Sequence, residues 1–349
     1  MPIQLDPVNT VATKKILPGV VDNFFKSGPL IAYLKTRFNR RWTGPLIQEN
    51  FMYGVPGKGG AYKKGAQFNT VQQQNKTGML FGPRYYNVNV TEFLEDLEVE
   101  MAGPTAAFSQ LKVDLSAAAI QMSSILEIAG YHNGQNVGGV DRTAEINGLE
   151  EALTDGVNTT LFGNVFASYG GQTRASVAPA LNSPVGLIPV SNTTTSFRVL
   201  EHSFMSCTIG AERPKLGLTS NRMMGFIAET FSPQQKIDVL DPEINWPGMK
   251  FNTATIVVSQ YIPSQDGVND PNLGDYSAES ESLLWLNPGP QGDDAYLRLY
   301  IAQSPKFAFG FTGFKGARDD NQVSGQILFG GNFTDRSPRL GRWLYGFIQ

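Results

Sequence analysis

The most regular pattern of apolar positions lies between Pro104 and Gly130. Apolar side chains recur there at alternating spacings of three and four residues, at Phe108, Leu111, Leu115, Ala118, Met122, Ile125 and Ala129. This spacing places them on one face of an α-helix, with proline at a favourable first position and glycine at a favourable C-cap. The pattern predicts one long helix over 104–130, packed on a sheet. A coiled coil is less favoured because the repeat is short and lacks regular flanking charge pairs.

A strand-like alternation precedes this helix in residues 45–91. It predicts three strands around a glycine-rich run, at Leu46–Tyr53, Phe68–Gln73 and Arg84–Val90. We expect a long β-hairpin with a flexible basic tip. Its apolar residues are too few for a core of its own, so it must lie against another body. The run is not a phosphate-binding loop, because Gly59 follows Lys58 where serine or threonine is required.

Two polar segments flank these elements. Residues 1–44 are basic and contain a possible amphipathic helix around Asp22–Phe38, which Pro29 interrupts. Between the hairpin and the long helix, acids alternate with apolar residues, at Glu92, Glu95, Asp96, Glu98 and Glu100. Such alternation predicts an exposed strand that enters the helix, and acids placed in this way more often keep an edge soluble than catalyse a reaction.

The remaining chain divides into two parts. Residues 146–290 have the pattern of a compact α/β lobe, with helices at Leu149–Leu153 and Asn221–Phe231 and a strand at Phe251–Tyr261. The acidic insert 262–282 fits no EF-hand spacing, so we expect a solvated surface loop there and not a calcium site. Residues 291–349 return to aromatic-rich strands, at Ala295–Ile301, Phe307–Phe311, Gln326–Phe329 and Leu340–Phe347. These strands and the long helix are expected to form a second lobe.

Composition narrows the classes of function. The chain has 349 residues, above the ~250–300 at which a single core stops growing, so two lobes or one elongated body are expected. Its one cysteine, Cys207, excludes an intrachain disulfide and favours a reducing compartment. We expect Cys207 to be buried in a strand-like stretch, Phe204–Ile209. The longest uncharged stretch, Ala175–Phe197, contains three prolines, so no membrane-spanning segment is predicted.

The inventory of catalytic chemistry is nearly empty. Two histidines, His132 and His202, leave little material for metal sites or Ser-His-Asp triads. The motifs G-x-S-x-G, H-E-x-x-H and C-x-x-C do not occur in the sequence. The sequence therefore predicts a protein that is not an enzyme and has no cofactor and no metal.

Charge is unevenly distributed along the chain. Residues 1–84 hold 12 basic and 3 acidic side chains, a balance of +9, and the remainder holds 16 basic and 28 acidic ones, a balance of −12. Blocks of opposite sign favour head-to-tail association of copies, contact of a basic arm with a polyanion, or both, and the simplest alternative is a pair of solvated faces. No zinc-finger spacing or helix-turn-helix signature indicates sequence-specific reading of DNA.

Four stretches carry a resemblance to a known family: Gly148–Leu153, Tyr169–Arg174, Pro214–Asn221, and the ending from Gly330–Phe333 to Pro338–Arg339. Taken in this order, and together with the basic arm, hairpin, long helix, α/β lobe and returning strands, they cover essentially the whole chain. The sequence resembles the major capsid proteins of tailed double-stranded-DNA bacteriophages, which have the Hong Kong 97-type fold.

The resemblance implies an α+β, Hong Kong 97-like capsid fold. Its parts would be an N-terminal arm (1–44), an extended β-hairpin or E-loop (45–91), a peripheral domain (92–145 and 291–349) with the spine helix 104–130, and an axial domain (146–290). It implies a structural subunit, without a catalytic site, that self-assembles into hexamers and pentamers of an icosahedral shell enclosing the phage genome. The implied partners are further copies, a separate scaffolding protein, a portal, a decoration protein and non-specifically contacted double-stranded DNA, with no membrane. The implied location is the virion, and the host cytoplasm during assembly.

The hairpin would then reach across an adjacent subunit. Its lysines would face carboxylates of that neighbour, and the residues of this hypothesis are Lys58, Lys63, Lys64 and Lys76 on one side and Glu95 and Glu98 on the other. The arm is too short to hold the cleaved scaffolding extension of some relatives. Nor do we expect the lysine–asparagine crosslink that some relatives form, because no acceptor is evident. Three alternatives stay open: an encapsulin-type shell around a cargo protein, a phage tail or adaptor protein, and a soluble hydrolase.

Overall fold

The computed structural model of the chain describes residues 28–54, 60–67, 74–93, 104–158, 160, 162–184, 186–187, 196–230, 238–240, 247–263, 281–316 and 321–347. Several expectations lie outside these ranges, among them the arm before residue 28, the hairpin tip around Lys58, a strand at Phe68–Gln73, the acidic stretch after Phe93 and most of the acidic insert. No helix in the described ranges has the length and the apolar character needed to cross a membrane.

The described strands form two main sheets. The first sheet has the order β1-β15-β18-β16, and β4 and β17 also pair with β18. Its strands are β1 (Asn39–Trp42), β4 (Arg84–Phe93), β15 (Leu297–Ala302), β16 (Ala308–Phe311), β17 (Lys315–Gly316) and β18 (Gln322–Asp335). The second sheet has the order β11-β12-β13-β10-β14-β19-β9. Its strands are β9 (Gly186–Leu187), β10 (Leu216–Thr219), β11 (Asp238–Leu240), β12 (Pro247–Phe251), β13 (Ala254–Val258), β14 (Glu281–Leu286) and β19 (Arg342–Phe347).

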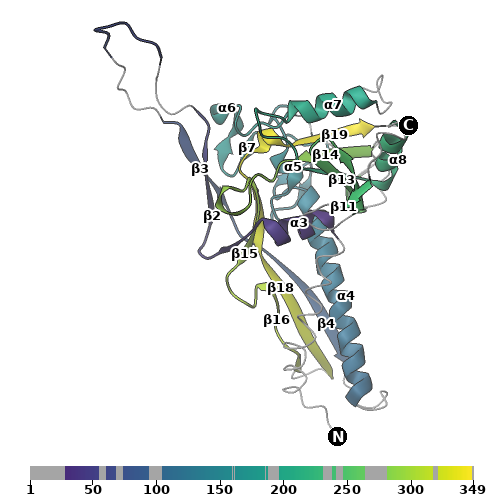
Figure 1. Cartoon of the computed structure of the whole chain (residues 1–349). Helices are drawn as coiled ribbons and strands as arrows, with labels where there is room; N and C mark the ends of the chain where they lie inside the picture. The colour runs from purple at the N-terminus through teal and green to yellow at the C-terminus, as the bar shows by residue number, and fades with distance from the viewer. Residues whose placement is uncertain are drawn as a thin grey trace.

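A long helix covers the ribbon that β4 and β18 form. These two strands pair antiparallel from Phe93↔Gln322 to Arg84↔Gly331. Helix α4 (Pro104–Tyr131) occupies the segment for which the apolar spacing predicts a helix, and it runs beside the ribbon (Figure 1). The apolar positions of the pattern that face the core are buried, at Leu111, Leu115, Ala118, Met122 and Ala129. The helix therefore packs on a sheet, as the sequence predicts.

The second sheet is covered on both faces. On one face α7 (Phe197–Ser206) and α8 (Asn221–Thr230) pack on a cluster that includes Phe204, Phe251 and Trp285. The other face belongs to the main core. All residues of β10 and β14 are consequently buried, which is expected of central strands with two covered faces. The step from β10 to α8 is capped by Ser220, whose Oγ accepts the Met223 amide at 3.1 Å.

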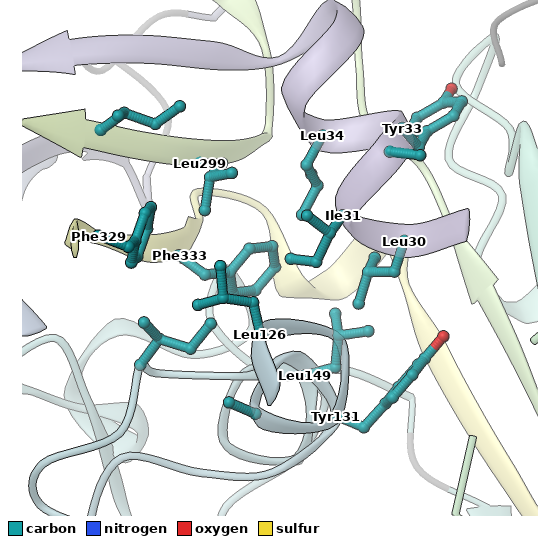
Figure 2. Packing of buried hydrophobic residues seen from close by; sticks show 14 of the residues in the cluster. Leu30, Ile31, Tyr33, Leu34, Leu126, Tyr131, Leu149, Leu299, Phe329 and Phe333 are labelled. Atoms are coloured by element: carbon teal, nitrogen blue, oxygen red, sulfur yellow. The ribbon is translucent and has the colours of Figure 1, made fainter. Parts of the chain in front are cut away.

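Helix α3 (Pro29–Arg37) closes the main core where α4 and the first sheet meet. Figure 2 shows Leu30, Ile31 and Leu34 of this helix directed toward Leu126 of α4 and Phe333 of β18. Each fully buried side chain of this size contributes about 1.5–3 kcal/mol to folding. Pro29 is the first residue of this helix, a position that tolerates a proline because its N–H would have no partner within the helix.

Two expectations from the sequence differ from the structure. The stretch Phe204–Ile209 is not a strand: Phe204 belongs to helix α7, and Cys207 is buried at its C-cap. Short apolar runs do not distinguish a strand from a buried helix end. The last strand, β19, pairs with β14 and β9 in the second sheet and not with the strands of the first sheet. The strand expected within Phe251–Tyr261 is present as β13, and a turn at Asn252, with φ of 50°, separates it from β12.

Candidate functional site at the projecting hairpin

A two-stranded hairpin projects from the body of the protein (Figure 1). Strands β2 (Ile47–Met52) and β3 (Lys76–Phe81) pair antiparallel, from Ile47↔Phe81 to Met52↔Lys76, and they form a sheet of their own. The segment Arg84–Val90, which the alternation groups with the hairpin, instead belongs to β4 of the first sheet. An isolated pair of strands is marginally stable, so the direction of the hairpin depends on what holds its base.

The two faces of the hairpin differ in exposure. Burial alternates along β2, so Ile47, Glu49 and Phe51 face the body. On the outer face, Met52 is 52% exposed and Leu80 is 51% exposed. The same face carries the polar side chains of Gln48 and Asn50, which hydrogen-bond to each other at 3.1 Å, so it is a mixed polar and apolar surface.

A buried ion-pair cluster holds the inner face. Arg298 of β15 donates from Nη1 to both carboxylate oxygens of Glu49, at 3.0 and 2.9 Å. The hydroxyls of Tyr300 and Thr334 donate to Oε1 of Glu49 at 2.7 and 3.3 Å, and Nε of Arg336 lies 3.5 Å from Oε2. Both side chains of the central pair are only 3% exposed. We call these five residues the Glu49 cluster. It ties the hairpin to β15 and to the C-terminal end of β18.

A glycine turn grips the other strand of the hairpin. Strands β7 (Ser168–Tyr169) and β8 (Gln172–Thr173) enclose Gly170, whose carbonyl accepts the Leu80 amide at 2.9 Å. Gly170 has φ of +54°, and a Cβ there would lie 2.6 Å from Cβ of Met79. Only glycine fits such a position. This turn therefore clamps β3, on the side of the hairpin opposite the Glu49 cluster on β2.

The predicted contact residues divide into two groups. Lys63 and Lys64 are exposed in the loop beyond the strands, and Lys76 is exposed at the first residue of β3. Within the described part of the chain, no ion pair joins these three lysines to an acid. Lys58, Glu95 and Glu98 lie outside the described residues. The predicted pairing between subunits therefore stays a prediction.

The Glu49 cluster was not predicted from the sequence. A signal was present, because Glu49 lies between Ile47 and Phe51 on the apolar face of a predicted strand. An acid at such a position requires a buried partner. The partners Arg298 and Arg336 lie 249 and 287 positions further along the chain, so their identity depends on the tertiary fold.

A second buried carboxylate joins α3 to α4. Oε1 and Oε2 of Glu127 accept the backbone amides of Leu30 and Ile31 at 3.0 and 2.8 Å. The hydroxyls of Tyr131 and Ser259 also donate to Oε1, at 3.0 and 3.3 Å. Burial raises the pKa of this carboxyl from 4.5 to about 7, and the four hydrogen bonds oppose that rise. Glu127 thus caps the first turn of α3.

The other candidate groups for chemistry are inactive in this setting. Burial raises the pKa of the Cys207 thiol to about 12, so the reactive thiolate does not form near neutral pH. Among the described residues, no group of three or more His, Cys, Asp and Glu side chains could hold a metal ion.

Comparison with known proteins identifies the fold. No protein-family model matches the chain, and no curated protein matches it by sequence. The capsid asymmetric unit of cyanophage A-1(L) is 13% identical, with 92% of this chain and 93% of that chain covered and a TM-score of 0.65. The holo-SrpI encapsulin complex from Synechococcus elongatus PCC 7942 is 9% identical, with 93% and 89% covered and a TM-score of 0.54. The capsid of a native GTA particle is 8% identical, with 90% and 89% covered and a TM-score of 0.54.

At these identities the comparisons establish the fold alone. The chain has a mixed α/β, Hong Kong 97-like fold that matches phage capsid proteins, which confirms the fold that the resemblance implies. An encapsulin has the same fold, so the structural neighbours are shell proteins of more than one kind.

Proposed function

We propose that this chain is the major capsid protein of a tailed double-stranded-DNA bacteriophage. Copies of it would assemble into hexamers and pentamers of an icosahedral shell around the genome. The observation that carries the proposal is the similarity to the cyanophage A-1(L) capsid over nine-tenths of both chains. We further propose that the chain is a structural subunit and not an enzyme, located in the virion and, during assembly, in the host cytoplasm.

The hairpin is the element that we assign to contact between copies. It has two strands, an outer face on which exposed Met52 and Leu80 accompany polar side chains, and exposed lysines in and beside its loop. Lys63, Lys64 and Lys76 would face carboxylates such as Glu95 and Glu98 of a neighbouring copy. Exposed ion pairs contribute only about 0–1 kcal/mol each. The pairs would therefore set the register of the contact, and repetition over many copies would supply its strength.

Further partners follow from a shell around DNA. The balance of +9 in residues 1–84 suits non-specific contact with packaged DNA. We propose a separate scaffolding protein, a portal and a decoration protein as the remaining partners, and no membrane.

Electron microscopy with light scattering on the purified chain tests the proposal, with and without a co-expressed scaffold candidate. Closed icosahedral shells, or rings of five and six subunits, are expected. A stable monomer under both conditions and at every salt concentration would contradict the proposal. Open tubes without closed shells would favour a tail or adaptor protein.

An encapsulin-type compartment is the second candidate, and the similarity to the encapsulin complex favours it. The contents of the particles separate the two candidates. Particles isolated from the source cells and treated with nuclease are expected to retain protected DNA if they are phage shells. Particles that contain a protein at fixed stoichiometry and no protected DNA would identify a cargo compartment.

A further inference from the structure

The base of the hairpin holds a charge arrangement that differs from ordinary core packing. From it we propose that Glu49 is a positioning residue, which fixes the direction in which the hairpin leaves the body. The inference concerns one subunit. Only its consequence for the contact between subunits rests on the proposed function.

The hairpin is attached to the body at its base. Among the described strands, β2 and β3 pair in a sheet only with each other. The turn at Gly170 holds β3, because Leu80 N–H donates to the Gly170 carbonyl and Gln172 Nε2 donates to the Gly78 carbonyl, and the Glu49 cluster holds β2. Apolar contacts hold the base through Ile47, Met79 and Phe81, and all three side chains are at most 2% exposed. Apolar packing is non-directional. It gives attachment, and the angle of attachment depends on groups with defined geometry.

The hydrogen bonds of the Glu49 cluster have a defined geometry. Nη1 of Arg298 lies within 3.0 Å of both oxygens of Glu49, which fixes the carboxylate relative to β15. Arg336 contacts the hairpin twice: its Nε lies 3.5 Å from the carboxylate, and its Nη2 donates to the Asn50 carbonyl at 2.9 Å. Arg336 also donates to the Asp293 carbonyl at 3.1 Å, so it bridges the hairpin and the turn before β15. Charge-assisted hydrogen bonds with fixed donors define a direction as well as an energy.

The hairpin acts as a lever, because its loop lies far from the base that Glu49 holds. Glu49 lies at the third position of the six-residue strand β2, and the loop with Lys63 and Lys64 lies beyond the strands. A small rotation at the base therefore becomes a larger displacement at the loop. Without its negative charge, the cluster would leave Arg298 buried and unpaired, and the base would shift to hydrate that cation.

Distances between two spin labels measure this direction. We choose Met52→Cys at the outer end of β2 and Ala117→Cys on α4, because both positions are exposed. The native Cys207 is fully buried and stays unlabelled. Labelled chain is diluted with unlabelled chain so that double electron–electron resonance reports distances within one subunit. A single narrow distance distribution is expected for the otherwise native chain, and a shifted and broadened one for Glu49→Gln.

Glu281→Gln is the matched control. Glu281 is also 3% exposed and lies 3.9 Å from an arginine, Arg222, but it lies on β14 and does not contact the hairpin. This variant should leave the distance distribution unchanged, even if it lowers the thermal stability as much as Glu49→Gln does. A Glu49→Gln distribution that coincides with that of the native chain would overturn the proposal.

Two milder variants cover the case in which Glu49→Gln does not fold. Arg336→Gln removes a side chain that is 25% exposed, and Tyr300→Phe removes one hydroxyl from the cluster. Each is expected to broaden the distribution less than Glu49→Gln. If neither variant changes it, the proposal is wrong.

Salt and assembly separate this proposal from the function proposed above. A buried pair is screened little by salt, so the distance distribution should be the same at low and high salt. Contact between lysines and a neighbouring copy should weaken as salt rises. If the native chain forms no shells, the proposed function fails while the distance measurement still tests Glu49. If shells form, Glu49→Gln should give malformed particles and Glu281→Gln regular ones.

Discussion

Glu49 and Glu127 are buried carboxylates that attach two different elements to the body, the hairpin and helix α3. At the base of the hairpin, Glu49 is compensated by the cations of Arg298 and Arg336. Under α3, Glu127 is compensated only by hydrogen bonds from two backbone amides and two hydroxyls, and no ion pair to it occurs among the described residues. An ion pair thus holds the hairpin to the body, whereas hydrogen bonds from the first turn of α3 to Glu127 hold that helix.

The two joints therefore respond to different changes, one to loss of a charged partner and the other to pH. A paired carboxylate in the core responds strongly to loss of its partner, because a single buried charge remains. A carboxylate without a cation responds to pH, because it can lose its charge by taking up a proton.

Removal of Arg298 should show how strongly the buried carboxylate of Glu49 depends on its cation. Arg298→Met is expected to lower the free energy of unfolding by about 3–5 kcal/mol, since Glu49 would stay buried with weaker compensation. Urea unfolding of unassembled subunits, followed by tryptophan fluorescence, measures the change. Arg222→Met is the control: Arg222 is 40% exposed, and its loss should change the stability by about 1 kcal/mol or less. Equal losses of stability in the two variants would show that the buried pair of Glu49 is no more important than the partly exposed pair of Arg222.

The pH dependence should come from Glu127. In the unfolded chain this carboxyl has its ordinary pKa of 4.5, and burial raises the pKa to about 7 in the folded chain. Between these values the folded chain holds a proton that the unfolded chain has lost. The stability that this proton gives is complete below about pH 4.5 and is lost, on the order of 3 kcal/mol in total, as the pH rises through about 7.

Glu127→Gln tests that assignment. Subtracting the unfolding free energies of the variant from those of the native chain, at several values between pH 4.5 and pH 8, isolates the contribution of Glu127. Burial also raises the pKa of Asp335 to about 7, but that group is present in both proteins and cancels. The difference should fall as the pH rises. A difference that is constant with pH would show that the carboxyl does not titrate in this range.

The clamp on the hairpin should be sensitive to volume at one glycine and not at the next. Gly170→Ala is expected to lower the free energy of unfolding by about 1–3 kcal/mol more than Gly171→Ala. Both residues have positive φ, but a Cβ at Gly170 would meet Met79, whereas nothing lies within 4 Å at Gly171. Thermal unfolding of the two variants measures the difference. Equal effects would mean that the turn does not grip the hairpin.

Reversal of the loop charges should affect assembly and leave the subunit intact. Lys63→Glu with Lys64→Glu is expected to change the free energy of unfolding by no more than about 0.5 kcal/mol, because both side chains are exposed. Shell assembly, followed by light scattering over a range of salt concentrations, should weaken and change its salt dependence. Unchanged assembly with unchanged salt dependence would contradict the predicted contact with a neighbouring carboxylate.

The sequence predicted local elements well where one pattern decided them. The helix over 104–130 has an uninterrupted spacing of three and four, and α4 occupies that segment. The step from β10 to α8 carries its own cap at Ser220. In both cases neighbouring residues supply the determining contacts, so the prediction did not require the tertiary fold.

Pairing between distant strands could not be predicted in the same way. The alternation in Arg84–Val90 specifies a strand, but its partner β18 lies more than 200 positions further along the chain. In the same manner β19 has the composition of a strand, and only the fold assigns it to the second sheet. Glu49 belongs to this class, because its arginines come from β15 and the end of β18. The candidate site was predicted as a hairpin with exposed lysines, and its buried anchor was not.

The position of β19 in the second sheet also determines when, during synthesis of the chain, this sheet can be completed. Strand β19 follows every other described strand along the chain, yet it lies between β14 and β9 inside the sheet. On a ribosome, β14 is synthesised about 60 residues before β19 and exposes an unpaired edge until Arg342–Phe347 emerges. The sheet therefore closes only after nearly all of the described chain has been made. A subunit whose synthesis stops earlier lacks this strand, and this excludes it from complete folding.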